Sequence, residues 1–230
     1  MSKAGRLSAP KACLFDLDGL LIDSEPLQAM AWKEATEQFH ATLTTEQLRQ
    51  LKGRRRDENA RLVSAWLDDS VTPQQLLTAR EPISKRLVAD APAMPGAEQL
   101  IRFCNSRRLP MVLVTSSTQD SLVYKTAGHP WLQLIERRVT GDDPELRAGK
   151  PAPDPYLLAI QRLDVQGHDC WAFEDSLAGC ESALKAGCWV WQLMDSAWEP
   201  SNQEPNHLIH RKLTRISTLM EGENQLRNSF

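Results

Sequence analysis

Apolar residues along this chain follow two patterns. Short strand-like runs occur at five places, over residues 11–17, 111–114, 138–140, 171–173 and 189–193. All but 138–140 (Arg-Val-Thr) are mainly apolar, which is typical of strands that are buried on both faces of a sheet. Around the last four runs, apolar residues recur at helical spacing over 97–106, 119–127, 155–163 and 177–186. Strands that alternate with helices predict an α/β fold with a doubly wound, parallel, Rossmann-like sheet.

Residues 20–93 differ, because their apolar positions follow helical spacing only and no convincing strand occurs. We expect helices over 26–39, 44–51, 57–67 and 72–89, the last with a break or kink at Pro82. A terminal helix is expected over 207–220. The sequence therefore predicts a flexible tail (1–10), an α/β core (11–19 and 94–230) and an inserted all-helical domain (20–93).

Composition narrows the class of protein. The 230 residues are 41% hydrophobic and 25% charged, which is ordinary for a globular protein. The net charge of −3 gives no reason to expect nucleic acid or an anionic membrane as a partner. No apolar run approaches the roughly 20 residues of a membrane span, and residues 1–10 lack the apolar segment of a secretory signal. Five cysteines without a CxxC pair are expected to be reduced thiols in a cytoplasmic protein.

The first apolar run ends in two aspartates, Asp16 and Asp18, followed at once by Gly19. An apolar run followed by acid-x-acid-Gly indicates a buried strand that ends in a tight turn. Two carboxylates held close together away from bulk water are costly unless a cation neutralises them. The sequence therefore predicts a divalent metal ion beside a carboxylate nucleophile.

Three further strands or loops carry groups of complementary chemistry. Ser116 follows the run 111–114, Lys150 lies in the loop before the helix 155–163, and Glu174 and Asp175 follow 171–173. Each signal is weak alone, but ligands of doubly wound sheets sit at the carboxyl ends of the strands. A nucleophilic carboxylate, a metal held by oxygen ligands, a hydroxyl, an ammonium group and a second acid are what phosphoryl transfer needs.

In this order, the segments DLDGLLIDSE, VTSS, GKPAPD and FEDSLAG resemble the four motifs of the haloacid dehalogenase superfamily. The helical insertion resembles the cap domain that this family places between its first two motifs. The resemblance covers roughly residues 11–195. It implies a Rossmann-like core, an aspartyl-phosphate intermediate and Mg²⁺ as the cofactor.

The resemblance also implies a role for each matching residue. Asp16 would be the nucleophile and a metal ligand, and Asp18 the general acid and base, with its backbone carbonyl on the metal. Ser116 and Lys150 would bind the phosphate and orient the nucleophile. Asp175 would bind the metal directly, with Glu174 supporting the metal shell.

Two features indicate which branch of the family the chain resembles. Members that break carbon–halogen bonds lack the second aspartate of the first motif, so Asp18 favours a phosphate ester. The segment 51–58 resembles the specificity loop of the beta-phosphoglucomutase branch, with Arg56 as the best match for an arginine that grips a second phosphate. A hydrated basic turn is the other interpretation of this segment.

The remaining candidates for substrate binding are Lys52, Trp32, Gly19 and Ser117, although Trp32 also suits a core position.

The hypothesis that follows is a Mg²⁺-dependent phosphatase that acts on a small phosphorylated metabolite, such as a sugar phosphate. A phosphosugar mutase is the first alternative. Gln28 disfavours it, because the mutase has a histidine at the matching position that is linked to cap closure. A non-catalytic binding module on the same fold is the second alternative. A monomer is the expected state.

Overall fold

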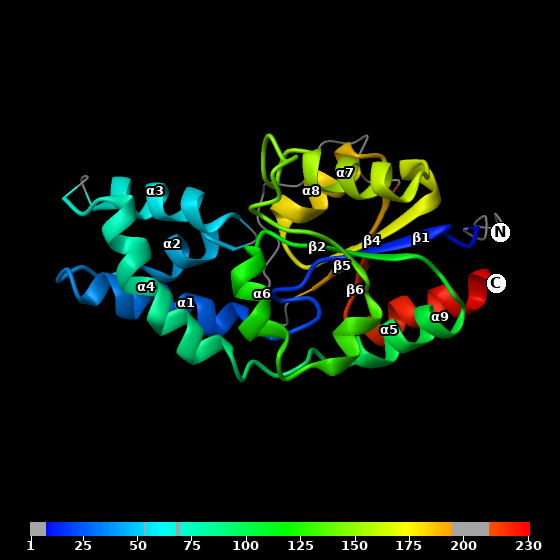
Figure 1. Cartoon of the computed structure of the whole chain (residues 1–230), viewed down its shortest axis with the longest axis horizontal. Coiled ribbons are helices and arrows are strands. Elements are labelled where there is room, and N and C mark those ends of the chain that lie inside the picture. Colours follow the sequence, from blue (N-terminus) through cyan, green and yellow to red (C-terminus); the bar gives the residue numbers. More distant parts are fainter. Residues whose placement is uncertain (1–7, 53, 68–69, 195–211) are drawn as a thin grey trace, which may run out of the picture.

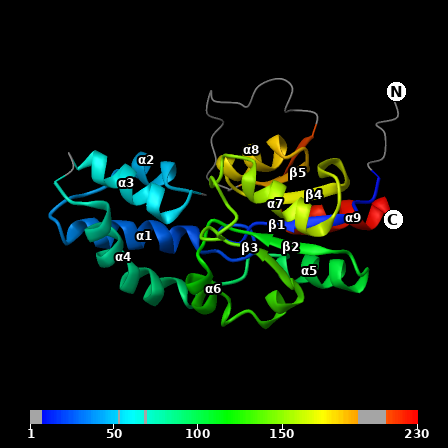
Figure 2. The ribbon, with the colours of Figure 1, turned by 45° about the horizontal axis from the view of Figure 1, so that its top comes forward.

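The computed structural model describes residues 8–52, 54–67, 70–194 and 212–230. Residues 1–7 of the predicted tail lie outside this part. The helices between residues 25 and 88 form one group, and a layered arrangement of sheet and helices forms the other, larger group (Figure 1). In Figure 2 the same two groups lie side by side.

A six-stranded parallel sheet forms the centre of the larger group. Its strand order is β3-β2-β1-β4-β5-β6. The strands are β1 (Ala12–Phe15), β2 (Met111–Val114), β3 (Arg137–Val139), β4 (Cys170–Glu174), β5 (Trp189–Leu193) and β6 (Leu213–Ile216). The order runs outward from β1 in both directions, which confirms the predicted doubly wound parallel fold.

Helices cover both faces of this sheet (Figure 1). On one face lie α5 (Ala97–Ser106), α9 (Leu219–Ser229) and the short η1 (Pro130–Leu134), packed with Cys13 and Phe15 of β1. On the other face lie α7 (Asp154–Leu163) and α8 (Leu177–Lys185), packed with Ala12 and Leu14. Because side chains alternate along a strand, each fully apolar strand serves two cores. Two further helices complete the core: α6 (Gln119–Thr126) follows β2, and the short η2 (Gly167–Asp169) directly precedes β4.

The last part of the chain corrects the prediction of a terminal helix over 207–220. Residues 213–216 form strand β6, which pairs with β5 through Val190 and Leu213, and α9 begins only at Leu219. Residues 207–211 lie outside the described residues. The open edge of β5 recruits β6 through backbone hydrogen bonds, which a short, mostly exposed sequence does not signal.

The inserted helices are α1 (Glu25–Glu37), α2 (Thr45–Gln50), α3 (Arg56–Trp66) and α4 (Pro73–Val88). Thr44 and Thr72 start α2 and α4 with capping boxes, in which hydroxyl and glutamine side chains satisfy free backbone groups. Of the break or kink expected at Pro82, the break is wrong, because α4 continues through this residue, and the kink stays a prediction. Packing of the buried side of α4 outweighs the missing hydrogen bond.

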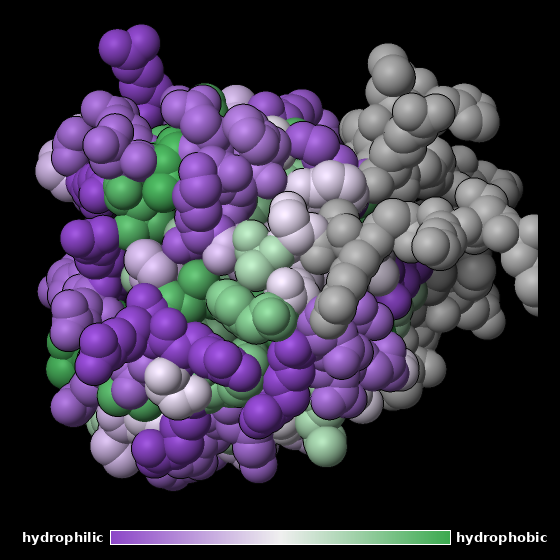
Figure 3. Space-filling model, turned by 90° about the vertical axis from the view of Figure 1, so that its right-hand side faces the viewer, coloured by the Kyte–Doolittle hydropathy of each residue, from purple (hydrophilic) through white to green (hydrophobic). Residues whose placement is uncertain are grey.

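The two connections between this helical cap and the core lie side by side. Ile22 and Ala93 form an antiparallel bridge, and the Asp23 N–H donates to the Pro92 carbonyl at 2.8 Å. The domain limits at 19/20 and 93/94 remain predictions. The strands run toward the cap, so their carboxyl ends face it (Figure 1). The opposite end of the molecule shows mainly hydrophilic side chains with small hydrophobic areas between them (Figure 3).

Candidate active site

Three carboxyl groups from two neighbouring strands meet at the carboxyl edge of the sheet. Asp16 follows β1, Glu174 ends β4, and Asp175 comes next. Since Phe15 pairs with Phe173, the two strands end at the same level. One carboxylate oxygen from each of the three residues lies within 4.8 Å of the others. The expected convergence of these residues is therefore present in the structure.

Lys150 is the cation at the centre of this group. Its ammonium nitrogen lies 2.6 Å from Oδ1 of Asp16, 2.5 Å from Oε1 of Glu174 and 2.9 Å from the carbonyl oxygen of Val114. The side chain is 1% exposed. Three acceptors thus satisfy its three N–H groups, and the lysine fixes Asp16 relative to β2 and β4.

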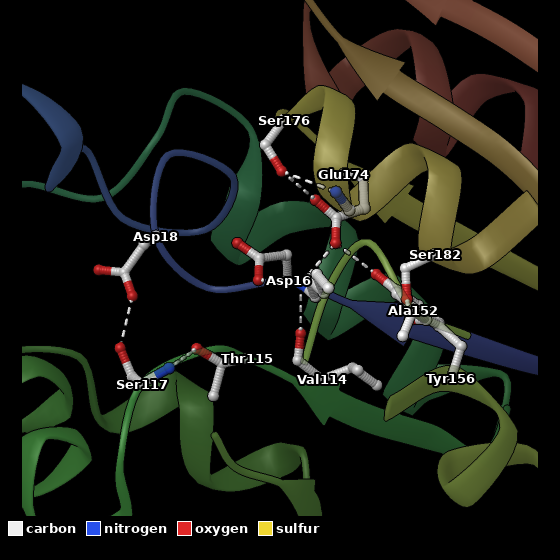
Figure 4. Close-up of polar contacts among 12 residues, drawn as sticks. Asp16, Asp18, Val114, Thr115, Ser117, Ala152, Tyr156, Glu174, Ser176 and Ser182 are labelled. Atoms are coloured by element: carbon white, nitrogen blue, oxygen red, sulfur yellow. Dashed lines mark hydrogen bonds and ion pairs between the residues drawn. The ribbon is translucent and has the colours of Figure 1, made fainter. Parts of the chain in front are cut away.

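Tyr156 is a member of the site that the sequence analysis missed. Its hydroxyl donates to Oε1 of Glu174 at 2.6 Å, and Figure 4 shows it on the side of Glu174 away from Asp18. The fully buried Glu174 also packs against Gly179, where a Cβ would lie 2.1 Å from both carboxylate oxygens. A signal was present in the sequence, since Tyr156 lies in the first turn of the helix after the GKPAPD segment.

Asp18 lies apart from this cluster, with its carboxylate turned toward Ser117 (Figure 4). Ser117 Oγ donates to it at 2.7 Å and Ser24 Oγ at 2.5 Å. Lys125 of α6 lies 2.6 and 2.8 Å from its two oxygens and 2.7 Å from Ser117 Oγ. Lys125, which is 3% exposed, was also missed. The available sign in the sequence was its spacing: Lys125 follows Ser121 by four residues and Ser117 by eight, which places residues of a helix on one face.

Burial and neighbouring charges shift the pKa values of Asp16, Asp175 and Asp18 in different directions. Burial raises the pKa of Asp16 well above its usual range, against the influence of Lys150, and the nearby carboxylates add to the rise. Burial likewise raises the pKa of Asp175 to about 6, although Lys52 opposes this. Burial also acts on Asp18, but Lys125, Ser24 and Ser117 outweigh it and lower the pKa of this carboxyl. Asp18 is therefore held as a carboxylate, while the three carboxyl groups of the cluster outnumber the single ammonium group of Lys150.

The cluster of Asp16, Glu174 and Asp175 can hold a metal ion. It offers hard oxygen ligands within 4.8 Å of one another, and the raised pKa values of Asp16 and Asp175 indicate that a further cation would be favourable. The donor set therefore fits a divalent cation such as Mg²⁺. The side chain of Asp18 is outside this cluster, which leaves its backbone carbonyl as the group expected to face the metal.

Two glycine positions allow the close approach of these groups. Gly19 has φ +82°, and a Cβ there would lie 2.2 Å from Oδ2 of Asp175. Gly141 lies against the backbone carbonyl of Ser116, where a Cβ would be 2.2 Å from the oxygen. The predicted phosphate-binding residue Ser116 is thus fixed by backbone packing.

A cavity lies between the cap and the core, above the aspartates. Its core side includes Asp16, Asp18 and Ser116, and its cap side includes the predicted substrate-binding residues Trp32, Lys52 and Arg56. Gln28 and Arg80 of the cap also line the cavity. The Nζ of Lys52 lies 2.9 Å from Oδ2 of Asp175, so the cap reaches the carboxylate cluster. Trp32 is 2% exposed and packs in the cap core, as the alternative interpretation expected.

Comparison with known proteins matches residues 10–187 to the family model "haloacid dehalogenase-like hydrolase". The chain is 35% identical over 187 residues to the "Probable pseudouridine-5'-phosphatase" of Drosophila melanogaster, covering 80% of this chain and 81% of that protein. It is 31% identical over 207 residues to the mitochondrial (DL)-glycerol-3-phosphatase 1 of Arabidopsis thaliana, covering 87% and 69%. The crystal structure of a beta-phosphoglucomutase from Clostridium difficile superposes with a TM-score of 0.75 at 17% identity, covering 94% and 98%, which shows the shared fold.

With this fold and this carboxylate cluster, the chain belongs to the haloacid dehalogenase-like hydrolases. Its relatives are named phosphatases and act on small phosphorylated compounds, which confirms the expected class, a phosphoric monoester hydrolase.

Proposed function

We propose that this protein is a Mg²⁺-dependent phosphatase that hydrolyses a small phosphorylated metabolite, such as a sugar phosphate, through an aspartyl-phosphate. The observation that carries this proposal is the position of Asp16. Its carboxylate lies 2.6 Å from the Lys150 ammonium and within 4.8 Å of two further carboxyl groups, and it lines the cavity between cap and core.

In the first half of the reaction, a carboxylate oxygen of Asp16 attacks phosphorus and the ester oxygen leaves. Asp18, in its protonated form, gives its proton to that oxygen, so that an alcohol is released, Asp16 carries the phosphoryl group and Asp18 is left as a carboxylate, whose proton is replaced in the second half of the reaction. Lys150 and Ser116 bind phosphoryl oxygens and hold Asp16 in line. When bound, Mg²⁺ supplies charge neutralisation for the phosphate and the carboxylates.

In the second half, water attacks the phosphorylated Asp16. Asp18 takes a proton from this water, which restores the Asp16 carboxylate and releases phosphate. The contacts of Asp18 with Lys125, Ser24 and Ser117 favour its carboxylate form, which is the form that accepts a proton. This arrangement suits hydrolysis of the intermediate.

Hydrolysis is favoured over mutase activity by the cap residue Gln28. Its Oε1 accepts hydrogen bonds from Arg80 and Ser84, and an amide cannot titrate as a histidine can. A mutase would convert one sugar phosphate to its isomer without accumulating free phosphate. Measuring both products with the same sugar phosphate separates the two functions.

The proposal also includes the cellular compartment, the oligomeric state and the partners of the protein. Five free, buried cysteines support a reducing compartment such as the cytoplasm. Within the described part of the chain, no helix is long and apolar enough to cross a membrane. We propose a monomer that needs neither nucleic acid nor a membrane as a partner.

The test uses a chromogenic aryl phosphate with Mg²⁺ and with EDTA. We expect EDTA to abolish turnover, and Asp16→Asn to lower kcat by about a thousandfold or more, because the amide is a poor nucleophile. Asp120→Asn, an exposed aspartate of α6, is the matched control and should behave as wild type. Turnover that survives both EDTA and Asp16→Asn would rule out this function.

A further inference from the structure

Arg80 is a buried cation that the mechanism above does not use. It lies on α4 of the cap, is 9% exposed and lines the same cavity as Asp16. Its guanidinium carbon lies 4.6 Å from the centre of the Trp32 ring, and its Nη2 donates to Oε1 of Gln28. Among the residues that the structure describes, the buried Nε finds no hydrogen-bond partner.

The charge of Arg80 also has no counterion in direct contact within the described part of the chain, because Asp18 and Glu25 act on it only from a distance. It forms no ion pair with a carboxylate in the described ranges, whereas the two lysines of the cavity do: Lys52 pairs with Asp175, and Lys125 pairs with Asp18. Burial lowers the pKa of Arg80 only to about 10, so the side chain is charged at neutral pH. A buried charge without a counterion is costly, and an anion placed beside it would recover much of that cost.

We propose that Arg80 binds an anionic group, a carboxylate or a second phosphate, at the end of the substrate remote from the ester that is cleaved. This inference rests on the proposed phosphatase function and names the class of substrate. The free Nε–H donates to one oxygen of the anion, and stacking on Trp32 keeps the planar guanidinium in place. Acidic phosphate esters are then selected over neutral polyol phosphates.

Arg80 differs in kind from Arg56, the arginine that the sequence analysis assigned to a second phosphate. Arg56 is exposed at the start of α3, whereas Arg80 is buried and held by Trp32 and Gln28. A rigid, desolvated guanidinium discriminates more strongly between a carboxylate and a hydroxyl than an exposed one does. Arg80 is therefore proposed as the residue that determines specificity.

The experiment compares substrates that differ only at the remote end. The three-carbon pair is 3-phosphoglycerate and glycerol 3-phosphate; the six-carbon set is 6-phosphogluconate, sorbitol 6-phosphate and sorbitol 1,6-bisphosphate. In the substrate set whose carbon chain has the length that fits the cavity, we expect the wild-type kcat/KM to be about tenfold or more higher for the anionic compound than for the neutral one. Arg80→Met should remove this preference, mainly through KM, and Arg80→Lys should retain part of it. Comparing 6-phosphogluconate with sorbitol 1,6-bisphosphate shows whether a carboxylate or a second phosphate is preferred.

Arg86→Met is the matched control, because Arg86 lies on the same helix but is exposed and pairs with Glu34. It should leave the wild-type preference unchanged. Equal losses on the anionic and neutral substrates in Arg80→Met, or no wild-type preference in either set, would overturn the proposal. If Arg80→Met does not fold, judged by its thermal unfolding transition, the same comparison with Arg80→Lys decides.

Binding separates this proposal from the phosphatase function. The affinities of the same compounds for Asp16→Asn and for Asp16→Asn with Arg80→Met can be measured by calorimetry with Mg²⁺ present. An anion preference that disappears with Arg80 supports the subsite even if wild-type protein hydrolyses none of the esters. Hydrolysis of an aryl phosphate together with equal affinities supports the phosphatase and excludes the subsite.

Discussion

At the scale of single residues, Lys125 and Asp18 illustrate how one buried ion pair orients a proposed acid and base. Lys125 contacts both oxygens of Asp18 and also Ser117 Oγ, while Ser24 closes the remaining side. Three polar groups from three segments therefore hold one carboxylate. Such a pair adds little net stability compared with apolar residues, but breaking it leaves an unpaired buried charge.

We predict that Lys125→Met lowers the free energy of unfolding by about 3–5 kcal/mol at pH 7, because Asp18 loses its cation. Urea unfolding gives this value. The double variant Lys125→Met with Asp18→Asn should recover part of the loss. Lys11→Met, which breaks the exposed pair with Asp169, is the control and should lose far less. No recovery in the double variant would mean that Lys125 acts through packing alone.

At the scale of secondary-structure elements, the sequence predicts most of the fold because strand ends are local signals. An apolar run followed by acid-x-acid-Gly marks where β1 stops, and parallel order brings Asp16 and Glu174 together. Strand β6 and the unbroken α4 depend on pairing and packing with distant segments, so their local sequences mislead. The same reason hides Tyr156, Lys125 and Arg80, whose importance lies only in what they contact across the fold.

The approach of α8 to β4 gives a test at this scale. Gly179→Ala would place a Cβ within 2.1 Å of the Glu174 carboxylate, so the carboxylate or the helix must shift. We expect a loss of about 1–3 kcal/mol in stability and at least tenfold weaker Mg²⁺ binding, measured by calorimetric titration. Gly128→Ala is the control, since nothing lies within 4 Å of its Cβ. Unchanged Mg²⁺ affinity in Gly179→Ala would exclude Glu174 from the metal site.

At the scale of the whole molecule, the cap and the core meet over the carboxylate cluster. Lys52 reaches Asp175, and Arg55 packs on Gly149, where a Cβ would lie 2.3 Å from its side chain. Gly149 stands next to Lys150, so the cap touches the loop that supplies the central ammonium group. The cap is thus closed on the core in this structure, and the cavity between them is where a substrate would be held away from water.

A cation in the cluster would connect segments from the two central strands, which are far apart in the sequence. Because it binds the folded chain and not the unfolded one, Mg²⁺ at about one hundred times its Kd should raise the free energy of unfolding by about 2.7 kcal/mol. Urea unfolding with Mg²⁺ and with EDTA measures the difference. Asp175→Asn should reduce it strongly, because one oxygen ligand is lost from a site whose carboxyl groups lie within 4.8 Å of one another, while Asp120→Asn should keep it. If Mg²⁺ stabilises Asp175→Asn as much as wild type, the metal binds elsewhere, and the three carboxylates need another explanation for their crowding.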